Sequence, residues 1–406
     1  MIPFTHLHVH SQYSILDGAA AVGDLVKKAK DDGMTSIALT DHGTMFGIKD
    51  FHERCKKNGI KPILGVETYV ASRGIQFKDK SEKEDRSGDH LILLAKNEKG
   101  YRNLLKLVTI ANNEGMYYKP RIDKSLLEKF SEGLIVSTAC LGGEIPQCIL
   151  KGDIAGAEAA IQWFKSIFKD DFYLEVQRHK TIDPQLPGDV YEGQLIVNRE
   201  LLLLAQKYNV KVIASNDIHF TNEEDADAHD LLICLNTGKD IDDPNRMRYT
   251  KQEWFKTTAE MNAIFADIPF VLSNTQEIAD KVELYELDSN PIMPEFPIPA
   301  DFGSIDDYRQ NYPESVLREE FKDAFDRLGG YDKTLRVKFE SDYLKHIVYE
   351  GAVARYGERF SEEVKERIEF ELETIKSMGF PGYFLIVQDF ISAAREMNVI
   401  VGPGRG

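Results

Sequence analysis

The amino-acid sequence predicts an α/β fold in which about seven strands form a barrel of parallel strands, followed by a mainly helical region. Two observations lead to this prediction. Through residues 1–286, short runs rich in β-branched residues alternate with helical patterns, and repeated strand–helix units are typical of parallel sheets. A proline-rich stretch then interrupts the periodicity, and the remaining chain reads as charged amphipathic helices.

The strands and helices of the predicted barrel follow one another in chain order. The predicted strands are Thr5–His10, Ser36–Thr40, Pro62–Val70, His90–Ala95, Leu134–Ser137, Phe172–Val176 and Val210–Ser215. The helical patterns between them are Val22–Asp31, Gly47–Asn58, Tyr101–Asn112, Ile154–Phe168 and Tyr191–Tyr208.

A linker and a second domain follow. Residues 287–304 read LDSNPIMPEFPIPADFGS, with four prolines and little periodicity, which indicates an extended connection. Residues 305–406 form the predicted second domain. Its helices are expected at Tyr308–Arg327, Phe339–Lys376 and Phe384–Arg395, before a short strand at Val399–Val401 and a glycine-rich turn at Gly402–Gly406.

Composition and charge narrow the function classes. The chain has 406 residues, 42% of them hydrophobic, and a net charge of -17. An acidic chain argues against a protein that coats nucleic acid with its whole surface, but it fits a local site that captures divalent cations. The four cysteines form no CxxC pair, and the N-terminus does not read as a signal peptide. The apolar runs are too short to span a membrane, so we expect a cytoplasmic protein without membrane contact.

The first chemical signal is the pair His8 and His10. Residues two apart on a strand point to the same face, about 6–7 Å apart, and two imidazoles there can grip one metal. A single His-x-His motif is weak evidence for a metal site, since two partly buried histidines that bind no metal give the same pattern. We expect only a structural role for His6, which shares the alternation.

The signal strengthens because similar side chains recur at or near other predicted strand ends. In a barrel these ends converge on one mouth, where catalytic groups collect. Imidazoles with carboxylates suit zinc, manganese or iron, and nine ligands are too many for one ion, so two or three ions are expected. The nine candidate ligands are His8, His10, Asp17, His42, Glu67, His90, Cys140, Asp217 and His219.

Several motifs resemble a known family. HLHVHS, LTDHGTMFG, GVETYV, GDHLILLA, STAC and SNDIHF resemble the motifs of the polymerase and histidinol phosphatase (PHP) domain. YYKPRID, GFPGYFLIVQDFI and GPGRG resemble the form of this domain found at the N-terminus of bacterial replicative DNA polymerases of the C family, and not the stand-alone phosphatases. This resemblance covers essentially the whole chain.

The resemblance implies a distorted seven-stranded barrel of the PHP type holding a three-metal cluster. Its positions assign one metal to His8, His10, Glu67 and Asp217, a second to Glu67, His90 and Cys140, and a third to Asp17, His42 and His219. Hydrolysis of phosphodiesters is implied, with Glu67 as the bridging carboxylate and His8 and Asp217 beside it as catalytic residues. In such polymerases this activity is interpreted as a 3′–5′ proofreading exonuclease acting on the primer 3′ end.

The second domain resembles the start of a polymerase palm. Gly402, Gly404 and Arg405 would belong to the glycine-rich turn that meets an incoming triphosphate. The residues that bind the catalytic magnesium ions would lie past Gly406. We therefore expect no polymerisation by this chain alone. Expected partners of the full-length protein are DNA, a sliding clamp and a separate proofreading subunit.

The residues that hold DNA are less well defined by the sequence. Lys119, Arg121 and Arg178 are the candidates, and Tyr117 and Tyr118 are available to stack on bases or to pack within a loop.

Two rival functions remain open. One is a phosphatase acting on small phosphate monoesters with the same metals. The other is a non-catalytic, metal-stabilised scaffold that docks a separate proofreading subunit.

Overall fold

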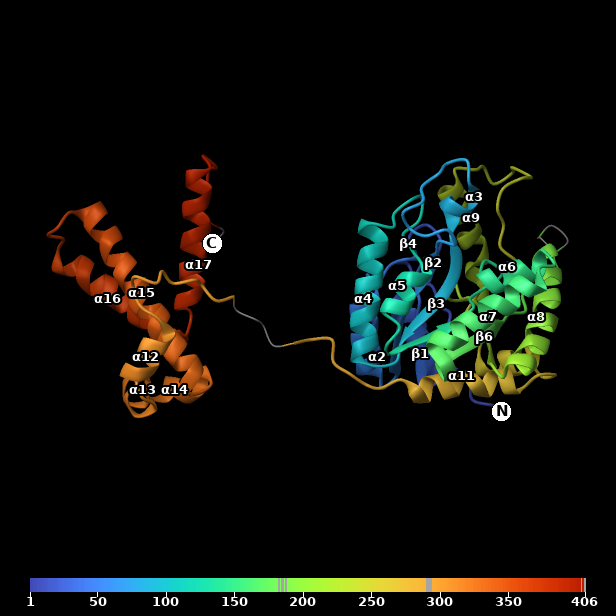
Figure 1. Ribbon diagram of the computed structural model, residues 1–406, viewed down its shortest axis with the longest axis horizontal. Helices are drawn as coiled ribbons and strands as arrows, with labels where there is room; N and C mark the ends of the chain where they lie inside the picture. Colours follow the sequence, from blue (N-terminus) through green and yellow to red (C-terminus); the bar gives the residue numbers. More distant parts are fainter. Residues whose placement is uncertain (182, 184–185, 187, 290–293, 403, 405–406) are drawn as a thin grey trace. The chain divides into compact units, whose positions relative to one another are not determined.

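The computed structural model describes residues 1–181, 183, 186, 188–289, 294–402 and 404. The chain divides into two compact units, Met1–Leu287 and Asp288–Gly406, which are described separately (Figure 1). Among the described residues, no helix has the length and hydropathy needed to cross a bilayer.

The first unit is built on one seven-stranded sheet. Its strand order is β1-β2-β3-β5-β6-β7, and the short β4 pairs with β2 outside this path. The strands are β1 Ser36–Leu39, β2 Lys61–Val70, β3 Asp89–Ala95, β4 Arg121–Ile122, β5 Leu134–Ser137, β6 Phe172–Val176 and β7 Lys211–Ala214.

The prediction of an all-parallel barrel is wrong at β3, which runs antiparallel to both β2 and β5. A parallel pair needs a crossover connection, usually a helix that packs on the sheet. The segment between β2 and β3 holds only the five-residue helix α3, Lys83–Ser87, and most of its described residues are exposed. The antiparallel pairing places Asp89 opposite Val70, so β3 begins at the end of the sheet where β2 finishes.

An extended segment replaces the predicted first strand, Thr5–His10. Only Val9 is bridged, to Ile218 beyond β7, and its carbonyl accepts a hydrogen bond from the N–H of Thr40. The N–H of Val9 donates to the Thr40 hydroxyl (2.8 Å) and not to a backbone carbonyl, which interrupts a regular ladder. The segment therefore lies between the end of β1 and the chain after β7, and it closes the sheet into a barrel.

The barrel interior changes from apolar to polar towards one mouth. Tyr173 of β6 and Ile213 of β7 belong to an apolar cluster inside the barrel, and α11, Phe270–Lys281, adds Ile278 to that cluster. In Figure 1, α11 lies across one end of the barrel, and Lys61 at the start of β2 donates to carbonyls of that region. Polar side chains line the opposite end of the barrel, where β2, β6 and β7 finish.

The outer helices largely match their predicted positions, because each buries an apolar face against the sheet. The predicted helices Val22–Asp31 and Ile154–Phe168 form with these bounds, as α1 and α7. The remaining helices of this unit are α2 Ile48–Asn58, α4 Glu98–Asn113, α5 Lys124–Lys129, α6 Glu144–Leu150, α8 Asp189–Tyr208, α9 Ala226–Thr237 and α10 Thr258–Ile264, with 3-10 turns at Lys169–Asp171 and Glu223–Asp225.

The second unit is helical, with more breaks than predicted. The single helix predicted at Tyr308–Arg327 is wrong, because the chain is broken there at residues 312–313 and at Lys322, whose φ is 48°. Gly357 and the N-cap Ser361 likewise divide the helix predicted at Phe339–Lys376. The helices are α12 Ile305–Asn311, α13 Glu314–Phe321, α14 Asp323–Leu328, α15 Tyr331–Tyr356, α16 Glu362–Met378 and α17 Pro381–Glu396.

The last residues of this unit do not form the predicted strand. Residues 399–401 form no β-bridge to a described residue, and a strand without a partner has no ladder to stabilise it. The N–H of Val399 donates instead to the carbonyl of Ala394 in α17 (2.8 Å). Gly402 and Gly404 are exposed. Arg405, the third residue predicted for the glycine-rich turn, lies outside the described residues.

Candidate metal centre

The nine candidate ligands meet at the polar mouth of the barrel, around a cavity of about 280 Å³. Glu67 lies within β2, and His90 is at the start of the antiparallel β3. The extended N-terminal segment and the turn after it supply His8, His10 and Asp17, and the turns after β1, β5 and β7 supply His42, Cys140, Asp217 and His219. His42, Glu67, His90, Cys140, Asp217 and His219 line the cavity directly.

Glu67 is the centre of the cluster. Its side chain is 1% exposed, and Oε1 lies 2.7 Å from Nδ1 of His90. Oε2 lies 2.5 Å from Nδ1 of His42 and 3.4 Å from Nε2 of His10. Two residues earlier, a Cβ on Gly65 would come 2.6 Å from the Leu93 carbonyl oxygen, so only glycine lets β2 approach β3 this closely. One carboxylate thus touches imidazoles from three segments.

His8, His10 and Asp217 form a second contact group. Asp217 Oδ1 lies 3.0 Å from Nε2 of His8 and 3.4 Å from Nε2 of His10, and the two Nε2 atoms are 3.1 Å apart. His8 and His10 are 1% and 0% exposed. Two ring nitrogens and a carboxylate oxygen therefore converge on one point.

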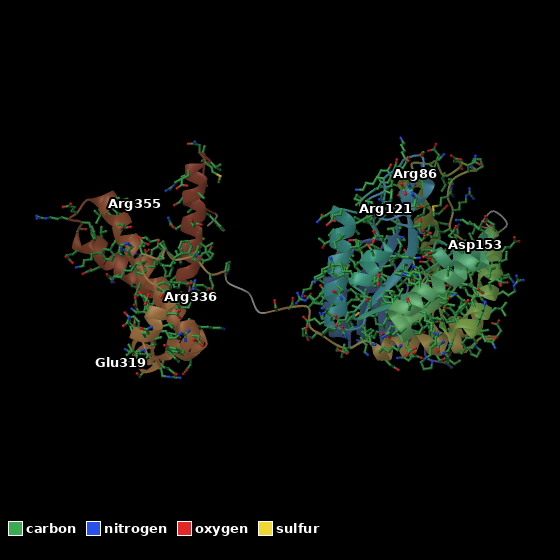
Figure 2. All side chains as sticks on the ribbon, in the orientation of Figure 1. Arg86, Arg121, Asp153, Glu319, Arg336 and Arg355 are labelled. Carbon is green, nitrogen blue, oxygen red and sulfur yellow. The ribbon has the colours of Figure 1, made fainter. Side chains whose placement is uncertain are left out.

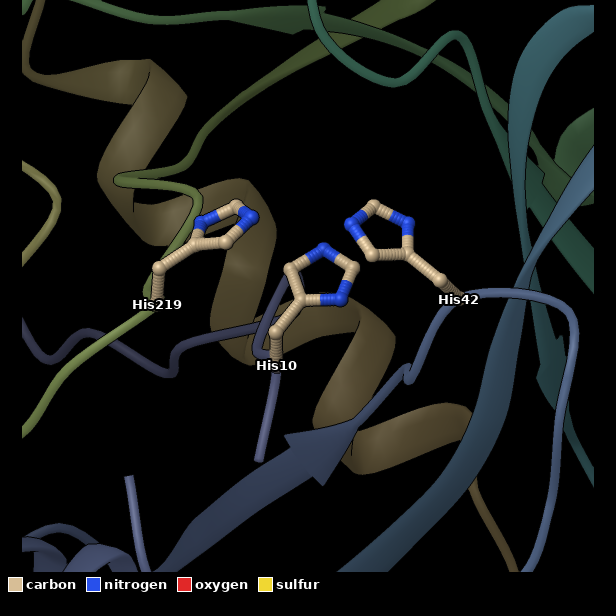
Figure 3. Close-up of side chains that lie close together, drawn as sticks. All are labelled: His10, His42 and His219. Atoms are coloured by element: carbon tan, nitrogen blue, oxygen red, sulfur yellow. The ribbon is translucent and has the colours of Figure 1, made fainter. Parts of the chain in front are cut away.

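Three imidazoles from distant segments face one another beside this group. Figure 3 shows the rings of His10, His42 and His219 directed towards one another. The His10 ring centroid lies 4.0 Å from that of His42 and 4.4 Å from that of His219. Nε2 of His42 also lies 2.9 Å from Oδ2 of Asp17.

The donor atoms fit divalent metal ions. Three sets each offer ligand atoms within 4.8 Å of one another: His10, His42 and His219; His8, His10 and Asp217; and Glu67, His90 and Cys140. Both ring nitrogens of His42, Oε2 of Glu67 and Oδ1 of Asp217 are buried, and none of these atoms makes a well-aligned hydrogen bond among the described residues. They lie at ion-pair distance from one another or from a neighbouring ligand instead. Imidazole nitrogens and carboxylate oxygens gathered in this way are ligands that divalent transition metals prefer.

The charges of the cluster are coupled. Burial would raise the pKa of Glu67, but the imidazoles of His90 and His42 hold it well below its usual range. Burial lowers the pKa of His10 to about 3, helped by the neighbouring imidazoles of His42 and His219. His10 is therefore neutral at pH 7 and keeps the lone pair that a metal needs.

Three residues at the polar mouth have strained backbone conformations. Leu16, Ala139 and Asp217 have left-handed backbones, with φ of 63°, 57° and 47°. Non-glycine residues seldom adopt this conformation, and functional sites are where it is usually retained. Each of the three is a candidate ligand or immediately precedes one (Asp17, Cys140), so the strain aims these side chains into the mouth.

Two residues of the site were not predicted from the sequence. Glu175, in the apolar run FYLEV, accepts a hydrogen bond from Nδ1 of His8 (2.8 Å) and another from Ser137 (2.6 Å). A charged residue at an inward-facing strand position is a signal that could have identified it. Tyr249 lines the cavity from an irregular loop, where no periodicity marks it.

The three residues predicted to contact DNA differ in how far their side chains are exposed and already bonded within the protein. Lys119 is exposed, and its ammonium lies 5.3 Å from the centre of the Tyr69 ring. Arg121 (labelled in Figure 2) is 0% exposed, and its guanidinium donates to the carbonyls of Gly115, Ile75, Phe77 and Asp85.

Arg178 is also committed within the protein. It donates to both carboxylate oxygens of Asp267, at 2.6 and 2.8 Å, and to the carbonyl of Ile264. The guanidinium donors of Arg121 and the two terminal nitrogens of Arg178 are thus engaged within the protein, whereas Nε of Arg178 has no hydrogen-bond partner among the described residues. Substrate binding by these two residues stays a prediction.

Two known protein families match this chain, one within each of the two units. The PHP domain family matches residues 6–179, and the family described as the bacterial DNA polymerase III alpha NTPase domain matches residues 342–406. DNA polymerase III subunit alpha of Borreliella burgdorferi is 42% identical over 405 residues, which are 99% of this chain and 31% of that protein. The subunit alpha of Campylobacter jejuni is 41% identical over 421 residues, covering 100% of this chain and 32% of its own.

The chain thus spans about a third of the length of these curated relatives. Among solved structures, a two-domain protein of Bacteroides vulgatus, described as containing a predicted PHP-like metal-dependent phosphoesterase, is 14% identical. It covers 71% of this chain and 73% of its own, with a TM-score of 0.32.

Proposed function

Because the chain belongs to the family of bacterial DNA polymerase III alpha subunits, we propose that its barrel hydrolyses phosphodiester bonds at the 3′ end of DNA. One observation carries this proposal. Nine side chains of metal-binding types meet at one mouth, and three sets of them offer ligand atoms within 4.8 Å of one another. A proofreading 3′–5′ exonuclease is the activity that such a site would supply in a replicative polymerase.

The site would hold two or three divalent ions such as zinc, manganese or iron. Its ligands would be His8, His10, Asp17, His42, Glu67, His90, Cys140, Asp217 and His219. Bound there, such ions polarise a phosphoryl oxygen and activate water for attack.

The chain's own residues organise this chemistry. Glu175 fixes the ring of His8 through Nδ1, which leaves Nε2 directed at Asp217. Glu67 reaches from β2 to imidazoles on both sides and is positioned to bridge neighbouring ions. His10 stays neutral and presents a lone pair.

Lys119 is the candidate that remains for holding the DNA strand. It lies over the ring of Tyr69, which is itself 5.1 Å from the His90 ring and 6.2 Å from the His42 ring. Tyr118, next to it, is 60% exposed and presents a face on which an unpaired base can stack. The positive charge and the aromatic face together suit the end of a single strand.

The rest of the chain supports a wider assignment. We take residues 1–286 as the phosphoesterase domain, 287–304 as a linker and 305–406 as the start of a polymerase palm. The full-length protein would then be a magnesium-dependent DNA polymerase that works in the cytoplasm with a sliding clamp and a proofreading subunit. Gly402, Gly404 and Arg405 would meet the nucleotide in that larger protein.

The experiment that tests the proposal compares substrates. The manganese-loaded chain is incubated with a 3′-labelled single strand, a 3′-labelled mismatched primer and a nucleotide monoester, with a chelator-treated sample as control. Release of labelled mononucleotide, lost with chelator, is the expected result. Hydrolysis of the monoester alone would favour a small-molecule phosphatase. Turnover of none of the three by a chain that retains its metals would favour a structural scaffold.

A further inference from the structure

Tyr249 brings a hydroxyl group into the candidate metal centre from outside the part of the chain that matches the PHP family. It belongs to the loop between α9 and α10. The hydroxyl donates to Oδ1 of Asp17 at 3.0 Å and lies 3.3 Å from Nε2 of His219. One side chain therefore contacts two candidate ligands from different loops.

The loop holds this hydroxyl in place. Arg246 donates to both carboxylate oxygens of Asp230 on α9, at 2.6 and 2.5 Å, just before Tyr249. The Tyr249 ring centre lies 4.9 Å from that of His219 and 4.9 Å from that of His229. Nε2 of His229 in turn lies 2.8 Å from the backbone carbonyl oxygen of Asp17. The ring is thus packed between two imidazoles, and the hydroxyl has little freedom to move.

The hydrogen bonds around His219 determine which of its two ring nitrogens carries the proton. Nδ1 of His219 lies 2.8 Å from the backbone carbonyl oxygen of Asp217, so Nδ1 must carry the proton and Nε2 holds the lone pair. A tyrosine hydroxyl has one proton to donate. With that proton on Asp17, the lone pair of His219 has no donor from Tyr249 and is directed into the group with His10 and His42.

We propose that Tyr249 is a positioning residue of the metal centre, whose hydroxyl holds Asp17 and His219 at the spacing that one bound divalent cation needs. The inference rests on the proposed metal-dependent function and adds a residue to it. Hydrogen-bond partners that orient metal ligands typically contribute about 10- to 100-fold in metal affinity. Tyr249 acts on two ligands at once, so its loss should weaken one ion selectively.

The test is a manganese titration of the whole chain, in which free Mn²⁺ is followed by electron paramagnetic resonance. Tyr249→Phe removes one oxygen and keeps the ring, and it should weaken one equivalent of Mn²⁺ by about 10- to 100-fold, leaving the others unchanged. Tyr101→Phe, a change at a partly buried tyrosine on α4 away from the mouth, is the matched control and should leave the titration as in the wild type. Thermal unfolding of the metal-free proteins shows whether each variant folds.

A double-mutant cycle separates positioning from packing. If Tyr249 acts through Asp17, the effect of Tyr249→Phe should largely disappear in an Asp17→Asn background, whereas a packing defect would add to it. Identical titrations of the wild type and Tyr249→Phe, or full additivity in the cycle, would overturn this inference alone. A wild-type chain that binds no Mn²⁺ would overturn it together with the proposed metal-dependent function.

Discussion

Glu175 lies 2.8 Å from Nδ1 of His8, at the bottom of the polar mouth, with both side chains almost fully buried. The carboxylate also accepts hydrogen bonds from Ser137 and from Gln177 (3.1 Å). It is thus held by several donors, and it fixes the orientation of the His8 ring. A carboxylate behind an imidazole is the usual way in which proteins orient a metal-binding histidine.

The first prediction concerns this pair. Glu175→Gln keeps the size of the side chain but removes its charge, and an amide nitrogen turned towards His8 would favour the wrong tautomer. We expect metal affinity or hydrolysis to fall by about 10- to 100-fold while the circular dichroism spectrum stays unchanged. Equilibrium binding of Zn²⁺ to both proteins measures this. An affinity within twofold of the wild type would show that His8 does not depend on Glu175.

The second prediction separates Arg121 from Lys119. Arg121→Ala leaves buried carbonyl oxygens without their donor, and we expect the free energy of unfolding to fall by about 3 kcal/mol or more. Lys119→Ala, at an exposed position two residues away, should change it by less than about 0.5 kcal/mol and should weaken binding of single-stranded DNA. Urea unfolding and fluorescence anisotropy measure the two effects. A stable Arg121→Ala variant that loses DNA binding would restore the sequence-based prediction.

The third prediction concerns pH. Burial alone would lower the pKa of His42, but the carboxylates of Glu67 and Asp17 raise it from 6.5 to about 9 in the metal-free protein. His42 therefore carries a proton at pH 7 that a cation must displace. Metal affinity should rise with pH, by up to about tenfold per unit below pH 9, with release of a proton. Calorimetry at pH 7 and 8.5 in two buffers measures both quantities, and a flat affinity across this range would contradict the prediction.

The fourth prediction concerns the boundary between the two units. The described residues between Leu287 and Ile305 form no helix or strand and follow the last residue of the first unit, so a protease should cut there first. The N-terminal fragment should remain folded and keep its metals, because the barrel has its own apolar core. Limited proteolysis followed by metal analysis of the fragment measures this. Unfolding of the barrel on cleavage would place the boundary elsewhere.

Much of the barrel could be predicted from the sequence because its signals are local. Helices such as α1 and α7 bury one periodic face. The candidate ligands were chosen by residue type and place, without knowledge of strand pairing, and the structure brings them together at one mouth. His90 lies there although β3 runs against its neighbours, because the start of an antiparallel strand and the end of a parallel one reach the same mouth.

The rest depended on information that a local pattern does not carry. In the irregular segment Thr5–His10, the Thr40 hydroxyl accepts a hydrogen bond from the N–H of Val9 and donates one to its carbonyl, which no periodicity predicts. Arg121 looked like a surface cation, and only the fold shows that four carbonyl groups converge on it. Tyr249 lies more than two hundred residues from Asp17 in the chain, so their contact is purely tertiary.

We propose that the nine side chains at the barrel mouth hold a multinuclear metal centre. Its most direct test is elemental analysis of the chain after loading with zinc or manganese and exhaustive dialysis, beside His8→Ala and Asp217→Ala variants treated in the same way. We expect two to three equivalents per chain in the wild type and fewer in both variants, which should remain folded. Less than one equivalent in the wild type, or equal content in all three proteins, would contradict it.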